Sequence, residues 1–302
     1  MAKALIIGCG DTGTRLATRL AQAGHAVSGL RRSAFALPGV TALAGDVTAP
    51  ASLRFPEGLD YVFVLLAPGE SREAAYRRVY LDGTRHVLAA LAGQALRRVF
   101  WISSSSVYGQ DDGSWVDEES PAEPASATAR VLLESEALLR ESAWPATIVR
   151  FAGLYGPGRL RLLRRVEAAT PVQAEPPQWT NRIHADDGAG MLAFLLERHE
   201  AGTALADTYI GSDDAPAPQH EVLDWLADHM RLPRLPRLPP AANAPAVPNA
   251  PQATLAWLPG AAGAGRNKRL SNERIAALGY RFLFPDYRSG YAAVLRARGE
   301  PR

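Results

Sequence analysis

Short apolar runs alternate with amphipathic segments along the first 150 residues. Residues 4–7 form an apolar run, and residues 14–21 then show the spacing of an amphipathic helix. Residues 61–66 are apolar throughout, as expected for a parallel strand buried on both faces. The other predicted strands and helices of this part lie at 26–30, 40–44, 73–92, 98–102, 127–140 and 146–150. This alternation predicts a parallel sheet with right-handed crossovers.

The pattern is less regular beyond residue 158. We predict short strands at 182–184 and 208–211, with a helix at 188–197 between them. Residues 233–265 are rich in Pro, Ala and Gly, which is typical of a long loop. Residues 272–278 are predicted to be helical, and 285–287 to form a turn.

These patterns together predict an α/β fold with two parts. The first is a Rossmann domain, a doubly wound parallel sheet, in residues 1–158, to which residues 182–211 return. The second is a smaller C-terminal substrate-binding region, made of residues 159–181 and 212–302. A chain of 302 residues is long enough for both.

Composition excludes several classes of protein. The net charge is +2, so we expect no nucleic-acid partner and no anionic membrane surface. Cys9 is the only cysteine, which excludes a disulfide framework and a cysteine-based metal site, and we expect no metal. No signal peptide and no run of about 20 apolar residues is visible. We therefore expect a cytoplasmic monomer or homodimer that binds a small-molecule substrate.

A glycine-spaced turn joins the first strand to the first helix. It reads Gly8-Cys9-Gly10-Asp11-Thr12-Gly13, the G-x-G-x-x-G pattern in the strand–turn–helix context that the pattern requires. Gly8 permits the tight turn, Gly10 lets a pyrophosphate approach the backbone, and Gly13 permits close packing of helix on strand. The helix N-terminus also favours phosphate. The turn predicts a dinucleotide site; the alternative is a glycine-rich turn that binds nothing.

Several segments together resemble the extended short-chain dehydrogenase/reductase family, also called the NAD-dependent epimerase/dehydratase family. Their order and spacing match that family across nearly the whole chain. The segments are residues 8–13, 45–46, 103–109, 155–158 and 183–187. Residues 268–272 and 278–280 also resemble an atypical bacterial branch whose substrates are largely unassigned.

The resemblance implies roles for individual residues. Asp46 matches the acid that reaches the adenine amine, although a simple turn acid is an equal alternative. Ala67 matches a small residue beside the cofactor. Ser104 matches the catalytic Ser/Thr that hydrogen-bonds the substrate oxygen; without the resemblance, the four serines at 103–106 are a polar strand end.

The chain departs from the family at its central chemistry, the Tyr-x-x-x-Lys pair of the helix after the fifth strand. Thr128 falls on the tyrosine and Leu132 on the lysine. A shifted register that places Arg130 on the lysine leaves Ser126 on the tyrosine. The chain has only two lysines, at positions 3 and 268, so no register restores the pair.

Two further departures concern substrate and cofactor. Thr180 stands where family members that act on nucleotide sugars often carry an arginine, which disfavours such a substrate unless Arg159, Arg161 or Arg182 replaces it. Arg31 and Arg32 stand at the end of the second strand, where NAD-selecting members carry an acid. Arginine accommodates a 2′-phosphate, so we predict NADP, with NAD as the alternative.

The missing pair leaves two hypotheses. In the first, the protein is an NAD(P)-dependent oxidoreductase or epimerase-like enzyme with a non-standard acid. Candidates for that acid are Tyr108, Tyr155 and His184, of which we select Tyr108, with Ser104, as catalytic. In the second, the protein is a catalytically degenerate NADP-binding sensor or scaffold.

Overall fold

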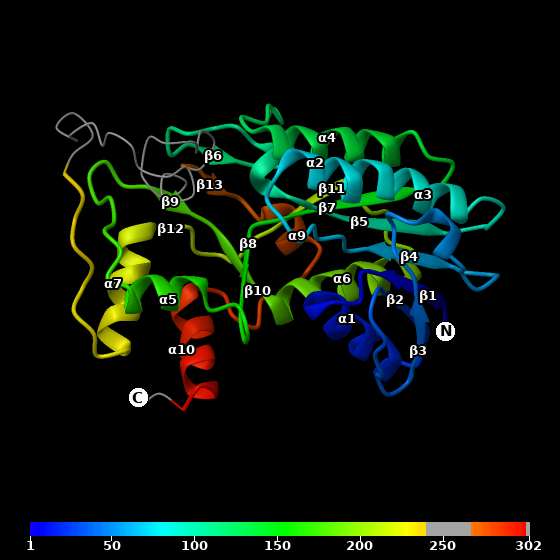
Figure 1. The fold of residues 1–302 in the computed structure, drawn as a ribbon, viewed down its shortest axis with the longest axis horizontal. Helices are drawn as coiled ribbons and strands as arrows, with labels where there is room; N and C mark the ends of the chain where they lie inside the picture. Colours follow the sequence, from blue (N-terminus) through cyan, green and yellow to red (C-terminus); the bar gives the residue numbers. More distant parts are fainter. Residues whose placement is uncertain (240–266, 300–302) are drawn as a thin grey trace.

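A computed structural model describes residues 1–239 and 267–299. Its central sheet has seven parallel strands in the order β11-β7-β5-β4-β1-β2-β3 (Figure 1). The chain begins in the middle of the sheet, runs to one edge, and then crosses back past β1, which confirms the predicted Rossmann fold. The strands are β1 (Lys3–Ile7), β2 (Ala26–Arg31), β3 (Val40–Ala44), β4 (Tyr61–Val64), β5 (Arg98–Ser104), β7 (Ala146–Phe151) and β11 (Thr208–Gly211).

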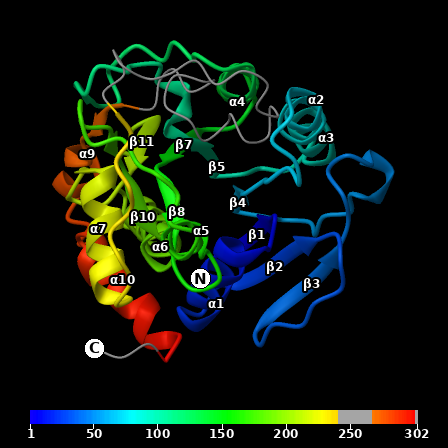
Figure 2. The ribbon, with the colours of Figure 1, turned by 60° about the vertical axis from the view of Figure 1, so that its left-hand side comes forward.

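Helices cover both faces of this sheet (Figures 1 and 2). One face carries α1 (Asp11–Gln22) and α6 (Ala185–Glu200), which pack against each other. The other face carries α2 (Glu73–Tyr76), a π-helical segment η2 (Arg77–Asp82), α3 (Gly83–Ala90) and α4 (Ala127–Arg140). The helix predicted at 127–140 is confirmed, whereas the one predicted at 73–92 contains the π-helical segment and ends at Ala90.

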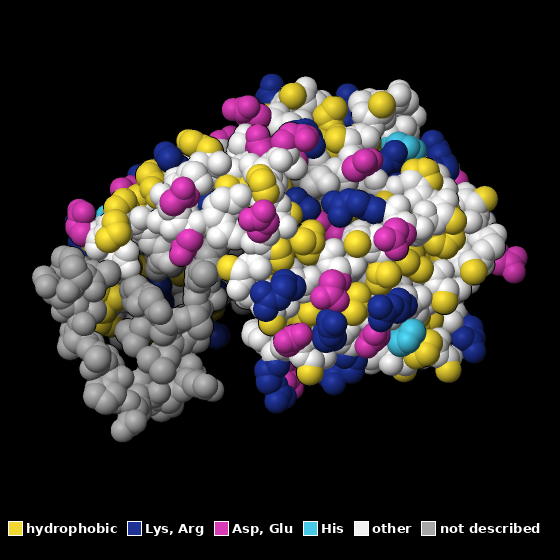
Figure 3. Space-filling model, turned by 90° about the horizontal axis from the view of Figure 1, so that it is seen from above, with side chains coloured by type: hydrophobic (Ala, Val, Ile, Leu, Met, Phe, Trp, Pro, Cys, Tyr) yellow, Lys and Arg dark blue, Asp and Glu magenta, His cyan; other side chains and the backbone are white. Residues whose placement is uncertain are grey.

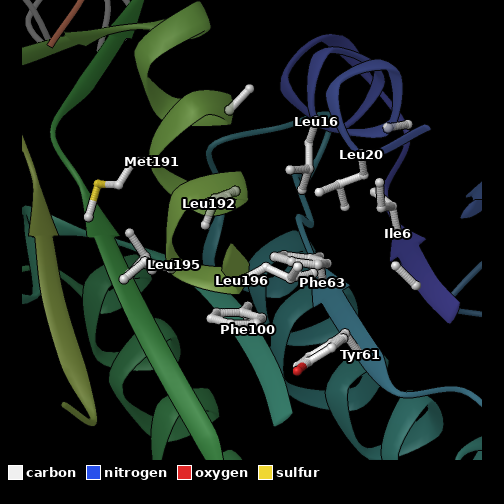
Figure 4. Close-up of a cluster of buried hydrophobic side chains, with 14 of the residues drawn as sticks. Ile6, Leu16, Leu20, Tyr61, Phe63, Phe100, Met191, Leu192, Leu195 and Leu196 are labelled. Carbon is white, nitrogen blue, oxygen red and sulfur yellow. The ribbon is translucent and has the colours of Figure 1, made fainter. Parts of the chain in front are cut away.

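The core beneath α1 and α6 shows why these segments fold as they do (Figure 4). The helical spacing of Leu16 and Leu20 puts both side chains on one face of α1, which is buried against the sheet. Leu192 of α6 is buried in the same cluster. Beneath them, the rings of Phe63 and Phe100 stack with their centroids 4.6 Å apart. Side chains of β4 are buried on both faces of the sheet, as the continuous apolar run predicts.

A second hydrophobic cluster lies among helices beyond the sheet. It joins α5 (Arg161–Glu167), α7 (Gln219–His229) and α10 (Tyr287–Ala297). Short strand pairs connect this part to the loops of the sheet; they are β8 (Gly153–Tyr155) with β10 (Arg182–His184), β9 (Trp179–Thr180) with β12 (Ala217–Pro218), and β6 (Trp115–Val116) with β13 (Arg269–Leu270). The remaining short helices are η1 (Pro50–Ser52), η3 (Ser105–Val107) and α9 (Glu273–Ala277).

Several sequence predictions for the C-terminal part were incomplete. The predicted turn at 285–287 is wrong at Tyr287, which begins α10. Asp286 caps this helix, since its carboxylate accepts a hydrogen bond from the Ser289 amide at 2.7 Å. Helices α5 and α7 were not predicted. Residues 240–265 of the predicted loop lie outside the described residues.

The outer face formed by α2, α3 and α4 mixes side chains of both charges. Figure 3 shows Lys and Arg groups interspersed with Asp and Glu on the visible face of the molecule. Arg77 of η2 and Glu134 of α4, for example, pair at 3.0 Å.

Within the described ranges, no helix combines the length and the apolarity that crossing a membrane requires.

Asp187 fastens the C-terminal segment to α6. Its carboxylate accepts hydrogen bonds from the backbone amides of Leu283 and Phe284, at 2.7 and 3.0 Å, and from the Tyr280 hydroxyl. The side chain is buried, so these donors replace water. Asp187, the last residue of the family-like segment 183–187, therefore holds two distant parts of the chain together.

Asp213 is a buried acid just beyond β11. Only 1% of the residue is exposed, and one carboxylate oxygen has no partner in the described part of the chain. The other oxygen accepts a hydrogen bond from the Ala215 amide at 3.3 Å. Burial raises the pKa of Asp213 to about 8, although the nearby positive charge of Arg182 opposes this; Asp214 and Asp286 raise it further. The folded protein therefore holds a proton on Asp213 that the unfolded chain releases.

This retained proton makes stability depend on pH. An unfolded Asp titrates near pH 4, so between about pH 4 and pH 8 the folded state binds more protons and stability falls as pH rises. We expect Asp213→Asn to remove this trend. Its free energy of unfolding relative to wild type should rise by about 1 kcal/mol or more between pH 5 and pH 8. Urea denaturation at both pH values measures it, with Asp82→Asn, at a half-exposed acid of η2, as the control. A constant difference between Asp213→Asn and wild type would contradict the prediction.

Candidate active site

The turn after β1 is built from contacts that only glycine permits. Gly8 has φ +93°, and a Cβ there would lie 2.1 Å from the Leu65 carbonyl oxygen. A Cβ on Gly13 would lie 2.4 Å from the carbonyl oxygen of Gly8. A Cβ on Gly10, by contrast, would meet no atom within 4 Å. Gly8 and Gly13 therefore permit packing, whereas Gly10 borders open space at the N-terminus of α1, which fits a pyrophosphate approaching the backbone.

Charged side chains surround this turn. The carboxylate of Asp11, the first residue of α1, accepts hydrogen bonds from Arg15 at 3.0 Å and from Arg159 at 2.8 Å. Arg15 also pairs with Asp186 of α6. Burial raises the pKa of Asp11, but the hydrogen bonds from the two arginines outweigh it and lower the pKa overall. The Thr12 hydroxyl is buried and has no partner within residues 1–239 and 267–299.

The residues predicted to bind the adenosine half of a dinucleotide follow β2, β3 and β4. Arg31 and Arg32 are exposed and form no ion pair with the described residues. Asp46 is occupied in its own turn, because its Oδ1 accepts hydrogen bonds from the amide and the hydroxyl of Thr48, both at 2.9 Å. This geometry favours the turn-acid interpretation for that oxygen. Ala67 is exposed just after β4.

Parallel pairing brings these residues to one edge of the sheet. Gly8, Arg31 and Ser104 lie at the carboxyl ends of β1, β2 and β5, and Ala67 follows β4. Ligands of doubly wound sheets bind outside this edge, near the strand where the order reverses. β1 and β4 are neighbours in the sheet. The predicted cofactor residues therefore share one ligand-binding edge with Ser104.

Ser104 ends β5 and caps the short helix η3. Its Oγ accepts a hydrogen bond from the Ser106 amide at 3.2 Å. A hydroxyl that accepts in this way still has a proton to donate. The side chain is half-buried. The local geometry thus orients Ser104 and leaves its O–H available to an oxygen of a ligand.

Tyr108 is placed differently. The residue is fully buried, and its hydroxyl accepts a hydrogen bond from Arg150 of β7 at 2.8 Å. Arg150 in turn donates to both carboxylate oxygens of Glu136 on α4, at 3.1 and 2.6 Å. Burial raises the pKa of Tyr108, although Arg150 opposes the increase. A proton donor must reach its substrate, so this geometry favours a packing role for Tyr108.

The helix positions that match Tyr-x-x-x-Lys carry no acid–base group. Thr128 lies in the first turn of α4, with its hydroxyl oxygen 3.2 Å from that of Ser126. Leu132 is 3% exposed and belongs to an apolar cluster with Val107, Val116 and other residues. Leu132, which the sequence analysis placed on the family lysine, therefore lies in a hydrocarbon environment.

The two other candidate acids are also buried. Tyr155 stacks on Tyr291 of α10, and burial raises its pKa. The Nδ1 of His184 accepts a hydrogen bond from the Asp186 amide and so caps α6, while its Nε2 has no partner among the described residues. Burial lowers the pKa of His184. A buried neutral imidazole that caps a helix matches the structural role expected of most histidines on short strands.

Lys268 is a buried cation for which the sequence predicted no structural role. Its ammonium donates a hydrogen bond to the Tyr108 carbonyl at 2.7 Å, and burial lowers its pKa to about 8. The side chain thus ties the segment before β13 to the loop after β5. Lysine is rare in this arginine-rich chain, and that rarity was a reason to single out Lys268. Its place in the structure depends on a contact with a residue 160 positions away, which local sequence does not predict.

The sequence profile of the NAD dependent epimerase/dehydratase family matches residues 4–211 of this chain. A curated relative, protein YeeZ of Escherichia coli K12, is 32% identical over 124 residues, which are 41% of this chain and 44% of the relative. The chain thus spans less than half the length of that relative.

Solved structures agree with this match. A protein of Methylobacillus flagellatus, assigned to the NAD-dependent epimerases/dehydratases, is 40% identical, covers 99% of both chains and has a TM-score of 0.78. A human epimerase family protein with NADPH is 20% identical, with a TM-score of 0.75 over 97% of this chain and 99% of that one. MoeE5 in complex with UDP-glucose and NAD is 22% identical, with a TM-score of 0.75 over 98% of both chains.

The open space beside Gly10 leads to a direct test of the turn. Gly10 has φ −82°, outside the left-handed region, so Gly10→Val should leave the fold intact. The isopropyl group would occupy the space that a pyrophosphate needs, and we expect binding of NADPH and NADH to be abolished. Gly10→Ala should weaken binding less. Calorimetric titration measures binding, and thermal unfolding checks the fold. Normal binding by a folded Gly10→Val protein would exclude this turn as the phosphate site.

Proposed function

The chain belongs to the NAD-dependent epimerase/dehydratase family, and from this premise we propose that it is an NADP-dependent oxidoreductase or epimerase-like enzyme acting on a small molecule. The observation that carries the proposal is the open space beside Gly10, at the N-terminus of α1 and at the ligand-binding edge of the sheet. The related structures named above contain NADPH in one case and NAD in another, so the 2′-phosphate is our own inference.

The residues that would hold the dinucleotide follow the strand order. The turn of Gly8, Gly10 and Gly13, with Asp11 and Thr12, would hold the pyrophosphate. The guanidinium groups of Arg31 and Arg32 are exposed and would bind the ribose 2′-phosphate. Asp46, through its Oδ2 atom, and Ala67 would contact the adenine and ribose.

The chemistry divides between cofactor and chain. A bound nicotinamide supplies hydride transfer. The Ser104 hydroxyl donates a hydrogen bond to the substrate oxygen, where negative charge develops as a carbonyl is reduced, and its orientation is set by the Ser106 amide. The packing of Tyr108 and Leu132 keeps both side chains out of this step. The acid that supplies the proton is a group other than the family's tyrosine, because Thr128 matches that position and its hydroxyl is a very weak acid.

A second candidate function is an NADP-binding sensor or scaffold without catalysis. Leu132, buried in an apolar cluster at the lysine-matching position, favours it. Oxidation of NADPH against a panel of carbonyl compounds distinguishes the two. Turnover with any compound supports the enzyme, whereas tight NADPH binding without turnover supports the sensor.

The proposed cofactor preference is measurable. Charge-assisted hydrogen bonds from arginine to the 2′-phosphate contribute about 1.5–3 kcal/mol, so NADPH should bind about tenfold to a hundredfold more tightly than NADH. Arg31→Asp should shift the preference toward NADH. The same change at Arg78, an exposed residue of η2, should leave the preference unchanged. Calorimetric titration of both cofactors measures the ratio. Equal or tighter binding of NADH by the wild type would overturn the assignment of NADP.

The assignment of Ser104 predicts a ranking of variants once a substrate is found. Ser104→Ala should lower kcat by about a hundredfold or more, because a hydrogen-bond donor at the developing charge is lost. Ser106→Ala, the same change two residues away on an exposed side chain, is the matched control. Thr128→Val should stay near wild type, since a threonine hydroxyl is a very weak acid. A larger loss of kcat in Thr128→Val than in Ser104→Ala would return the chemistry to α4.

A further inference from the structure

An arginine from outside the first βαβ unit reaches the phosphate turn. The chain leaves β8 through Gly156 and Gly158, which have φ +140° and +81°, and the Arg159 amide bonds back to the Gly156 carbonyl at 3.0 Å. This tight turn carries the Arg159 side chain to α1, where its Nε donates a hydrogen bond to Asp11 Oδ2 at 2.8 Å. The contact spans 148 residues of sequence.

Only part of the Arg159 guanidinium is used in this contact. Its Nε is bonded to Asp11, while its two terminal amino groups make no hydrogen bond within the described part of the chain. The side chain is 37% exposed, so ligand atoms can reach it. Asp11 directly follows Gly10, where an added Cβ would meet no atom within 4 Å. Asp11 therefore anchors a guanidinium whose donor groups lie beside the phosphate turn.

Asp11 alone would oppose phosphate binding. A carboxylate at the N-terminus of α1 places negative charge next to the position where the pyrophosphate would lie, and like charges repel. Arg15 and Arg159 bind the two oxygens of this carboxylate separately. With Asp186, which also pairs with Arg15, the cluster holds two acids and two bases, so the two arginines cancel the negative charge of Asp11 beside the turn.

We propose that Arg159 binds the pyrophosphate of the dinucleotide and that Asp11 is the positioning residue that aims it. This inference rests on the proposed function, since it assigns a further ligand to the same cofactor. The planar guanidinium can keep Nε on Asp11 while its amino groups bond two phosphate oxygens. Because Arg159 follows β8 and is already bonded to Asp11, the dinucleotide would add a second link between the loop after β8 and the turn before α1.

The position of Arg159 favours the cofactor over a phosphate of the substrate. The Arg159 side chain is bonded to Asp11, the first residue of α1, directly after the turn that follows β1. Ser104, the proposed substrate contact, is on a different strand, β5. Arg182, another arginine that the sequence offered for substrate phosphate, is 4% exposed and donates to Thr180 Oγ1 at 2.6 Å. Arg159 thus combines exposure with a fixed place beside the dinucleotide turn.

The test compares two ligands on the full-length protein. NADPH carries the pyrophosphate, whereas adenosine 2′-phosphate carries only the 2′-phosphate. Arg159→Ala should weaken NADPH binding tenfold or more and leave the affinity for adenosine 2′-phosphate unchanged. Arg159→Lys keeps the charge but loses the planar fork, so it should fall between Arg159→Ala and wild type. Arg164→Ala removes an exposed arginine of α5 and should bind both ligands as wild type does.

Asp11→Asn separates positioning from structure. The variant weakens the ion pair that aims Arg159 but also removes the negative charge beside the pyrophosphate, so it should reduce NADPH binding less than Arg159→Ala does. In the Arg159→Ala background, where Asp11 has nothing to aim, it should cause no further loss. Equal NADPH affinity in Arg159→Ala and Arg164→Ala would overturn the inference while leaving the proposed function intact. So would an equal loss for both ligands in Arg159→Ala. A wild-type protein that binds neither NADPH nor NADH would overturn both the proposed function and this inference.

Discussion

The close approach of three backbone segments at the end of β1 constrains the rest of the structure. The Leu65 carbonyl lies where a side chain on Gly8 would be, and the Gly8 carbonyl lies where a side chain on Gly13 would be. These contacts set α1 against β1 and bring the end of β4 beside the turn. Of the three glycines in this turn, Gly10 alone borders empty space. The packing that builds the turn therefore leaves its backbone accessible to a ligand at Gly10.

A second constraint acts beneath α4. The buried pair of Arg150 and Glu136 fixes that helix to β7, and Arg150 also donates a hydrogen bond to the Tyr108 hydroxyl. A buried ion pair with several hydrogen bonds tolerates the loss of one partner poorly, since the other charge is then left in a dry interior. The region where the family resemblance implies acid–base chemistry is therefore occupied by a structural network and by Leu132. Ser104, at the end of β5, is the candidate residue at this edge whose hydroxyl is oriented and still has a proton to donate.

The sequence predicted the sheet well because its strands are apolar runs set apart by glycine-rich turns. The bounds of α4 followed from leucine spacing. One failure was local: the start of α10 at Tyr287 was interpreted as a turn, although Asp286 caps a helix there. The other failures arose where distant residues decide the outcome. The burial of Tyr108 depends on Arg150, and the raised pKa of Asp213 on packing that follows from the whole fold. Motifs predicted a cofactor site at the carboxyl edge of the sheet, but contacts across the chain decide which polar groups of that edge are available.

The central claim is that the turn after β1 receives a nicotinamide dinucleotide. A crystal structure of the protein grown with NADPH tests it most directly. The account predicts electron density for the pyrophosphate beside Gly10, within hydrogen-bond distance of the backbone amides at the N-terminus of α1, and the nicotinamide toward the end of β5. Density for the dinucleotide elsewhere on the protein, with the space beside Gly10 filled by water, would contradict the account.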